Sequence, residues 1–406
     1  MDTIKDVIIV GGGAAGFFSA INIASINPEL KILMLERGKE GLQKVKVSGG
    51  GRCNVTHAEF IPSELVLNYP RGKKELLGPF HQFMTGDTIQ WFEDRGIVLK
   101  TENDGRMFPE SNKSQTIIDC FLSEVKKLNI NILYNNSVKE ITHNNNNNQW
   151  IVSTDKNMYS AKKILITTGS NIKIWNIIKS LNHSIIDPVP SLFSFNIKDK
   201  RIDSIAGVTI KNVVIKVINT NLVSSGPLLI THNGLSAPSI LKLSAFGATE
   251  FSSLNYKFNI AINFINLSNE DCLDCLKNIK LKESKKLVIN SPLFDLSKRF
   301  WKKIVLYSNI PIKTKWADVN REQLDILTNL LTNSIFAVNG KSTHKEEFVT
   351  AGGVNLKEVD FKTFESKIHK NLYFAGEVLN IDAVTGGFNF QNAWTSGYIA
   401  SKAIAQ

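Results

Sequence analysis

The chain has 406 residues, of which 43% are hydrophobic and 21% charged, and this composition indicates a folded globular protein with more than one structural unit. No run reaches the roughly 18 consecutive apolar residues of a membrane-spanning helix, and the polar N-terminus does not resemble a signal peptide. Four cysteines are too few for a disulfide framework, and the seven histidines show no metal-ligand spacing. Cys272 and Cys275 form a C-x-x-C pair, but they lie far from the flavin motifs in the sequence, so we do not expect a redox role for them. We therefore expect a cytoplasmic protein with no membrane span and no metal.

The net charge is +11, because 48 Lys and Arg residues face 37 Asp and Glu residues. We expect the lysines to be spread along the chain, and we therefore favour compositional drift over a dedicated surface for nucleic acid as the origin of this excess. A clustering of the lysines on one face would argue for an RNA-acting protein instead. In either case the field favours anionic ligands such as dinucleotides.

The N-terminal segment predicts a β-α-β unit. Val7–Val10 is a continuous apolar run typical of a buried parallel strand, and Lys31–Leu35 is a second one. Between them, Gly11–Gly16 predicts a tight turn and Phe17–Ile26 a helix, which Pro28 ends.

The turn fits the pattern G-x-G-x-x-G of a dinucleotide-binding fold. Gly11 allows the tight turn, Gly13 allows backbone to approach a pyrophosphate, and Gly16 allows the helix to lie close to the strand. Ala14 and Ala15 occupy the variable positions at the helix N-terminus, where backbone N–H groups point at the phosphates.

Glu36 follows the second strand, 20 residues after Gly16. A carboxylate at this place accepts hydrogen bonds from ribose hydroxyls and repels a 2′-phosphate, so the site should take FAD or NAD and not NADP. Arg37 either stacks near the adenine or lies in solvent.

A second glycine cluster favours FAD. Leu372–Ala375 reads as a late strand that ends at Gly376 and Glu377. FAD is long and extended, so one glycine turn cannot hold all of it, and a late Gly-Glu turn would supply the rest. We predict non-covalent FAD, with any nicotinamide bound transiently because no second G-x-G-x-x-G is present.

The order of elements predicts an α/β fold with an insertion. Residues 1–192 and 346–406 should form a Rossmann-type FAD domain of the two-dinucleotide-fold kind. Residues 193–345 should form an inserted substrate domain, β-barrel-like over 193–267 and about 334–345 and helical over about 268–333. Within the first part, four strands over 130–167 fit a β-meander that returns to the main sheet.

Four segments together resemble a known family: Gly11–Gly16, Lys46–Asn54, Thr231–Pro238 and Phe374–Asn392. The chain is similar to the BaiN/YhiN-type NAD(P)/FAD-dependent oxidoreductases, which include aminoacetone oxidase-like flavoproteins. The string from Ser48 to Asn54 is the most specific of these motifs. The resemblance implies an oxidoreductase that transfers a hydride through flavin N5, with NAD(P)H reducing a small unsaturated or carbonyl-conjugated substrate.

The resemblance also implies which residues line the flavin. They form three groups along the chain: Lys46, Ser48, Gly49, Gly50, Gly51, Arg52, Cys53 and Asn54; Val138, Thr168 and Gly169; and Gly376, Glu377, Asp382, Gly386, Gly387, Phe388 and Asn389. The Gly386–Asn389 segment would direct a helix N-terminus at the flavin. The alternative is an ordinary helix start without a role toward the flavin, in which Asn389 is the N-cap. His232 and Asp382 are weak candidates for a proton donor.

Four positions depart from the expected family pattern. Pro227, Ala237, Asn380 and Ala383 stand where we expect Glu, Gly, Asp and Gly, whereas Asp382 is retained. The loss of an acid at position 380 leaves the substrate and the proton donor open. An amine oxidase that uses oxygen, an RNA-acting flavoprotein and a redox-sensing binding module remain alternatives.

Overall fold

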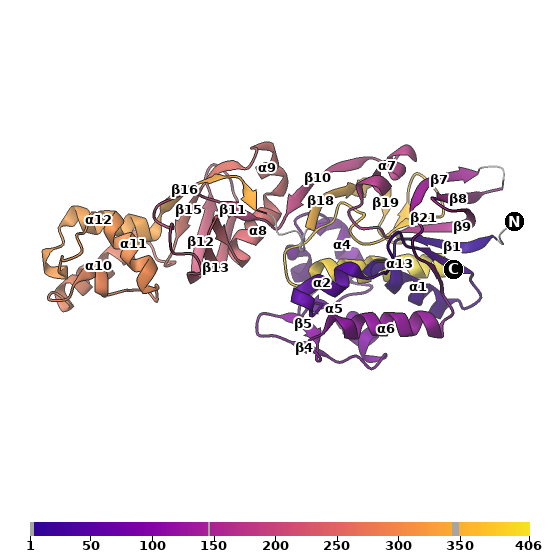
Figure 1. Cartoon of the computed structure of the whole chain (residues 1–406), viewed down its shortest axis with the longest axis horizontal. Coiled ribbons are helices and arrows are strands. Elements are labelled where there is room, and N and C mark those ends of the chain that lie inside the picture. Colours follow the sequence, from indigo (N-terminus) through magenta and orange to yellow (C-terminus); the bar gives the residue numbers. More distant parts are fainter. Residues whose placement is uncertain (1–3, 145–146, 343–348) are drawn as a thin grey trace. The chain divides into compact units, whose positions relative to one another are not determined.

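The computed structural model describes residues 4–144, 147–342 and 349–406. The chain divides into two compact units, residues 1–189 with 349–406 and residues 190–348 (Figure 1). The first division lies three residues before the predicted boundary at 192, and the second predicted boundary, at 345, lies outside the described residues. Among the described helices, none has both the length and the apolar character needed to cross a bilayer.

The first unit is built on a Rossmann-type sheet, as predicted. Its strands follow the order β19-β20-β21-β9-β1-β2-β6, and the centre is parallel. The parallel strands are β1 (Lys5–Val10), β2 (Ile32–Leu35), β6 (Asn131–Leu133), β9 (Met158–Ile166) and β21 (Leu372–Phe374). The last four residues of β1 and all of β2 are buried, which explains their unbroken apolar sequence.

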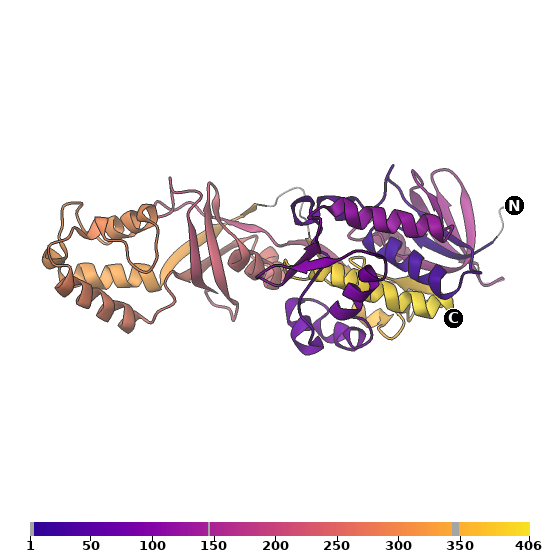
Figure 2. The ribbon, with the colours of Figure 1, turned by 90° about the horizontal axis from the view of Figure 1, so that it is seen from below.

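Two helices pack side by side on this sheet, α1 (Ala14–Ile26) and α13 (Phe388–Ala405) (Figures 1 and 2). Small residues allow the close approach: a Cβ at Gly397 would lie 2.8 Å from the Ser19 hydroxyl. The other helical elements of this unit are α2 (Gln43–Gly51), α3 (Pro62–Leu65), η1 (Val66–Asn68), α4 (Lys73–Phe80), α5 (Thr85–Glu93), α6 (Ser114–Lys127), α7 (Ile172–Ser180) and η4 (Leu356–Glu358).

The predicted four-stranded meander is wrong in its first strand. β6 pairs in parallel with β2, and the antiparallel meander consists only of β7 (Val138–Asn144), β8 (Gln149–Thr154) and β9. Sequence alternation identifies a strand but not its partner. The remaining strands of this unit are β3 (Thr56–His57), β4 (Leu99–Thr101), β5 (Arg106–Pro109), β19 (Val359–Asp360) and β20 (Glu365–Ser366). A separate pair, β10 (Ile185–Ser191) and β18 (Val349–Val354), holds the two places where the chain passes between the units.

The second unit contains a seven-stranded sheet that closes on itself. Its order is β16-β15-β12-β13-β14-β11-β17, and the two end strands follow each other along the chain with only Gly340 between them. One continuous segment therefore pairs with β15 and then with β11, as in a small barrel. The strands are β11 (Ser194–Asn196), β12 (Thr209–Val217), β13 (Val223–Thr231), β14 (Gly234–Ser236), β15 (Lys257–Asn263), β16 (Ser334–Asn339) and β17 (Lys341–Ser342).

Helices complete this unit. α8 (Pro238–Phe246) and α9 (Ala248–Ser253) lie at one end of the barrel and a helical part at the other (Figure 1). The helical part holds α10 (Asn269–Lys282), η2 (Val288–Asn290), α11 (Lys298–Tyr307), η3 (Trp316–Asp318) and α12 (Arg321–Thr332). One buried apolar cluster runs from Phe195 in the barrel to Trp301 in the helices, so the unit has a single core.

Candidate flavin site

The first glycine turn has the geometry that a dinucleotide cradle requires. Gly11 adopts a φ of +111°, and a Cβ at Gly16 would lie 2.0 Å from the carbonyl oxygen of Gly11. Only glycine allows this approach of the helix to the turn. At Gly13, the N-cap of α1, the nearest atom to an added Cβ is 3.9 Å away, so the N-terminus of α1 stays open to a ligand.

Backbone N–H groups orient the Glu36 carboxylate at the end of β2. Gly12 N donates to Oε2 and Gly38 N donates to Oε1, each at 2.7 Å. Because a carboxylate has about four acceptor sites, lone pairs remain for ribose hydroxyls. The neighbouring Arg37 side chain is exposed.

The Lys46–Asn54 segment is partly helical. α2 runs to Gly51, but Ser48 leaves the helical conformation (ψ 149°) and Gly49 and Gly50 have φ of +56° and +68°. No atom lies within 4 Å of a Cβ built on Gly50 or Gly51. The segment therefore presents bare backbone to its surroundings, as a phosphate-binding turn does.

Arg52 has partners within the protein. Its guanidinium donates to Glu102 Oε1 at 2.6 Å and lies 3.9 Å from the centre of the Phe108 ring. These contacts fix the position of the guanidinium, while its other N–H groups are available to a ligand. Lys46, in the same segment, is exposed and 4.0 Å from Glu40.

The start of α13 is a tight glycine turn against β3. Gly387 is the N-cap, with φ +95°, and a Cβ there would lie 2.5 Å from the Thr56 carbonyl. Gly386 O is 3.0 Å from His57 Nδ1, and the His57 ring stacks on Phe388. These contacts hold the helix N-terminus in place.

Asn389 is not the N-cap of α13. Its side chain reaches back to Ala383, where it accepts from the backbone N–H at 3.0 Å and donates to the carbonyl at 3.2 Å. The side chain therefore closes the turn before the helix. Preference for N-cap positions marks Asn as a helix-start residue but does not specify which backbone groups it contacts.

The three predicted flavin segments converge. Leu42 N donates to Gly12 O at 2.8 Å, which joins the start of α2 to the first glycine turn. At the other end of that segment, Trp394 Nε1 of α13 donates to Val55 O at 2.9 Å. Gly376 lies beside Ala15 of α1, where a Cβ would be 3.2 Å from the alanine methyl.

Glu377, Gly169 and the chain next to Val138 also lie near this site. Lys44 Nζ and Glu377 Oε2 form an ion pair at 2.6 Å, and both atoms lie 3.7 Å from a Cβ built on Gly169. Asn136 N donates to Glu36 O at 2.9 Å, which places the chain two residues before Val138 beside the end of β2.

Four polar side chains bordering these segments have buried atoms without a hydrogen-bond partner in the described part of the chain: Asn54, Thr168, Asn380 and Asn392. Asn392, in the second turn of α13, is fully buried and lacks a partner on both amide atoms. Buried polar groups are rarely left unsatisfied unless they face a ligand or water. Together with the open helix N-terminus of α1, they fit an extended dinucleotide such as FAD.

The two proton-donor candidates lie in different surroundings. Asp382 is fully buried and forms a bidentate ion pair with Arg71, so its carboxylate ties the turn before α13 to the chain near α4. His232 belongs to the second unit, where it is exposed in the turn between β13 and β14. Cys53 is buried, and burial raises the pKa of its thiol to about 12, which disfavours thiolate chemistry.

Sequence reasoning missed Lys44, His57, Arg71 and Asn392. Lys44 and Arg71 pair with acids more than 300 residues away, so no local pattern shows the contact. Asn392 did leave a signal, because a polar amide among the small and aromatic residues of a buried helix requires a partner.

The fold and the site define a Rossmann-type flavoprotein oxidoreductase. The family described as the HI0933-like protein Rossmann domain matches residues 5–403, and the chain belongs to this family. The expected resemblance to the BaiN/YhiN-type enzymes is thereby confirmed.

Three curated relatives match over nearly their full lengths. Two are named ribosomal RNA dihydrouridine synthase: the protein of Haemophilus influenzae, 24% identical over all of both chains, and that of Escherichia coli, 26% identical over 98% of this chain and 97% of the relative. The third is the 3-dehydro-bile acid delta(4,6)-reductase of Clostridium scindens, 22% identical over 98% of each.

Solved structures show the same fold. A 3-ketosteroid-delta4-(5alpha)-dehydrogenase from Rhodococcus jostii aligns over 100% of this chain and 97% of its own, with a TM-score of 0.55 and 11% identity. A flavocytochrome c3 fumarate reductase aligns over 100% and 78%, with a TM-score of 0.51 and 16% identity.

Proposed function

We propose that this oxidoreductase reduces a carbon–carbon double bond conjugated to a carbonyl group, with NAD(P)H as the electron donor. One observation carries the proposal: relatives that match almost the whole chain differ in substrate but share this chemistry. A uridine that becomes dihydrouridine gains hydrogen across a ring double bond next to a carbonyl, and a delta(4,6) 3-dehydro-bile acid has double bonds conjugated to its 3-keto group.

The residues of the chain would position the cofactor and the charge that develops during the reaction. When bound, FAD supplies a ring that takes up two electrons and passes them to the substrate. The first glycine turn and Glu36 would hold the adenosine and the pyrophosphate. The N-terminus of α13, held in place by His57 and Gly387, would direct about half a positive charge at the flavin.

The ion pair with Arg71 supports a positioning role for Asp382. A permanently charged guanidinium bound through two hydrogen bonds favours the carboxylate form, which has no proton to give. The proton for the second carbon of the double bond therefore comes from another group or from water, and His232 stays a candidate.

Anaerobic mixing tests the proposal. The yellow purified protein should bleach with NADH or NADPH and regain its colour with a cyclic enone, but not with the matching saturated ketone. Bleaching by an amine such as aminoacetone without nicotinamide, with peroxide formed in air, would support the amine oxidase instead. A flavin that stays yellow with both nicotinamides would contradict the donor half of the proposal.

The second candidate substrate is the uracil ring of an RNA. Two of the relatives have RNA in their names, and most of the net positive charge of this chain falls in one stretch, as the next subsection describes. Incubation of the protein and NADPH with RNA, followed by nucleoside mass spectrometry, should reveal uridine that has gained two hydrogen atoms. Free uridine serves as the control substrate.

A further inference from the structure

The net charge of the chain is concentrated in one short stretch. Residues 277–315 contain eleven Lys or Arg residues and two acidic residues, a net charge of +9 out of +11 for the whole chain. The expectation of evenly spread lysines is therefore wrong. All of this stretch lies in the helical part of the second unit.

Two segments of this stretch run side by side. Leu287 and Lys315 form an antiparallel bridge, Val288 N donates to Thr314 O at 3.1 Å, and Trp316 N donates to Lys286 O at 3.0 Å. The chain around Lys285 thus lies beside the chain around Lys315, although 30 residues separate them.

Helix α11 is attached to the same two segments. Trp301, on its buried face, donates from Nε1 to Val288 O at 2.8 Å, and its ring centre lies 6.5 Å from that of Trp316. The opposite face of the helix carries the exposed residues Lys298, Arg299 and Lys302. One apolar core therefore fixes all three basic segments.

Six exposed side chains of these segments form what we call the basic surface: Lys285, Lys298, Arg299, Lys302, Lys313 and Lys315. Among the described residues, none of the six forms an ion pair, whereas nearby Lys277 pairs with Asp274 and Lys286 with Glu283. Such a local excess of unpaired cations attracts a polyanion.

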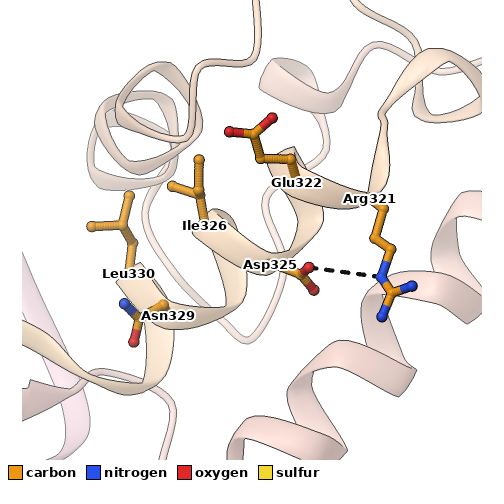
Figure 3. A pocket seen from close by; sticks show the side chains of 6 residues that line it. All are labelled: Arg321, Glu322, Asp325, Ile326, Asn329 and Leu330. Atoms are coloured by element: carbon orange, nitrogen blue, oxygen red, sulfur yellow. Dashed lines mark ion pairs between the residues drawn. The ribbon is translucent and has the colours of Figure 1, made fainter.

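The outer face of the neighbouring helix α12 has a different character. A shallow hollow there is lined by Ile326, Leu330 and Asn329 together with Glu322 and the Arg321–Asp325 ion pair, whose atoms are 3.9 Å apart (Figure 3). The helical part is therefore polarised, with acids and apolar side chains on α12 and unpaired cations on α11 and the two segments.

We propose that the basic surface binds the phosphate backbone of an RNA. Six unpaired cations on a rigid support match a chain of phosphates, and each phosphate contact releases bound counterions. The choice of RNA as the polyanion rests on the second candidate function above, but binding requires no turnover. An experiment can therefore contradict RNA binding by this surface without contradicting the proposed reaction, and the reverse also holds.

Fluorescence anisotropy of a labelled RNA hairpin with the full-length FAD-loaded protein tests this proposal. One variant combines Lys298→Gln, Arg299→Gln and Lys302→Gln, and another combines Lys285→Gln, Lys313→Gln and Lys315→Gln. Each should bind about 10-fold or more weakly, and the slope of log K against log salt should become less steep by about 2 to 3, since three phosphate contacts are lost.

A matched control combines Lys139→Gln, Lys156→Gln and Lys179→Gln, three exposed lysines of the first unit, with the same change in charge. Its affinity should equal that of the unchanged protein within 2-fold. Equal weakening in the control and in the two test variants would show a non-specific charge effect and overturn the proposal. Tighter binding to duplex DNA or to anionic vesicles than to the hairpin would overturn it as well.

Discussion

Ala237 stands in a backbone conformation that glycine normally occupies. Its φ of +85° and ψ of 174° lie in a region that residues with a Cβ enter only at a cost of about 1–3 kcal/mol. The family resemblance leads us to expect Gly at this position, just before α8. This chain therefore carries strain at the N-cap of α8.

Ala237→Gly should stabilise the protein by about 1 kcal/mol, because the relief of strain exceeds the 0.5–1 kcal/mol by which glycine favours the unfolded chain. The melting temperature should rise by about 2–4 °C, measured by circular dichroism. Ala261→Gly in β15, where the backbone is extended, is the control and should lower it. A fall in both variants would show that position 237 is not strained.

At the residue scale, sequence predicted what local pattern encodes. The spacing of Gly11, Gly16 and Glu36 identified the glycine turn and the carboxylate because each role depends on neighbours within about 25 residues. The Lys44–Glu377 pair joins residues 333 positions apart, and nothing in the sequence near either residue indicates the other. Long-range partners of this kind follow only from the fold.

At the scale of elements, the start of α13 depends on a glycine that cannot be replaced without displacing β3. Gly387→Ala would place a Cβ 2.5 Å from the Thr56 backbone at a φ of +95°. The variant should lose about 1–3 kcal/mol of stability from the backbone strain alone and retain less FAD after gel filtration. Gly78→Ala in α4, where a Cβ meets no atom within 4 Å, should keep its flavin and gain up to about 1 kcal/mol. If Gly387→Ala and Gly78→Ala lose the same amount of flavin, the conformation of this turn is not required for FAD binding.

A buried histidine links three elements at the edge of the main sheet. His183 Nδ1 is 3.1 Å from Glu358 Oε2, and its Nε2 is 2.9 Å from the Ser366 hydroxyl. Burial lowers the pKa of His183 below 6.5, against the opposing effect of Glu358. Burial alone would raise the pKa of Glu358, but hydrogen bonds from Ser184 and His183 lower it below 4.5.

Both shifts predict that acid destabilises the fold. Below pH 6.5 His183 takes up a proton in the unfolded chain but stays neutral in the folded chain. The stabilisation that it contributes to the folded state is therefore complete above pH 6.5 and falls as the pH drops towards the pKa of the folded state. Between pH 7.5 and 5.5 the loss from this group should reach at most about 1.4 kcal/mol. Urea unfolding should show a flatter pH dependence for His183→Gln, whereas His81→Gln, at an exposed site, should follow the unchanged protein. Parallel curves for His183→Gln and the unchanged protein would contradict the assignment.

At the scale of the whole molecule, the order of elements predicted the split Rossmann domain but not every strand pairing. The sequence predicts that the strand over residues 130–134 belongs to the meander, and only the sheet shows that β6 continues the parallel order beside β2. Closure of the barrel likewise depends on strands far apart in the sequence. The segment 334–342 pairs with β15 before Gly340 and with β11 after it. Pairing over such distances is a property of the assembled fold.

The two units should separate in function when the chain is divided. All three converging flavin segments belong to the first unit, and the second has its own core around Trp301 and Trp316, the only tryptophans within residues 190–348. A fragment of residues 190–348 should be colourless, with the short-wavelength tryptophan emission of buried indoles and a cooperative shift to longer wavelength in urea. Residues 1–189 joined to 349–406 by a short glycine-rich linker should bind FAD and turn yellow, because β10 and β18 pair where the chain leaves and re-enters this unit. A yellow 190–348 fragment, or a joined first unit that folds yet ignores added FAD, would show that the flavin needs residues of the second unit.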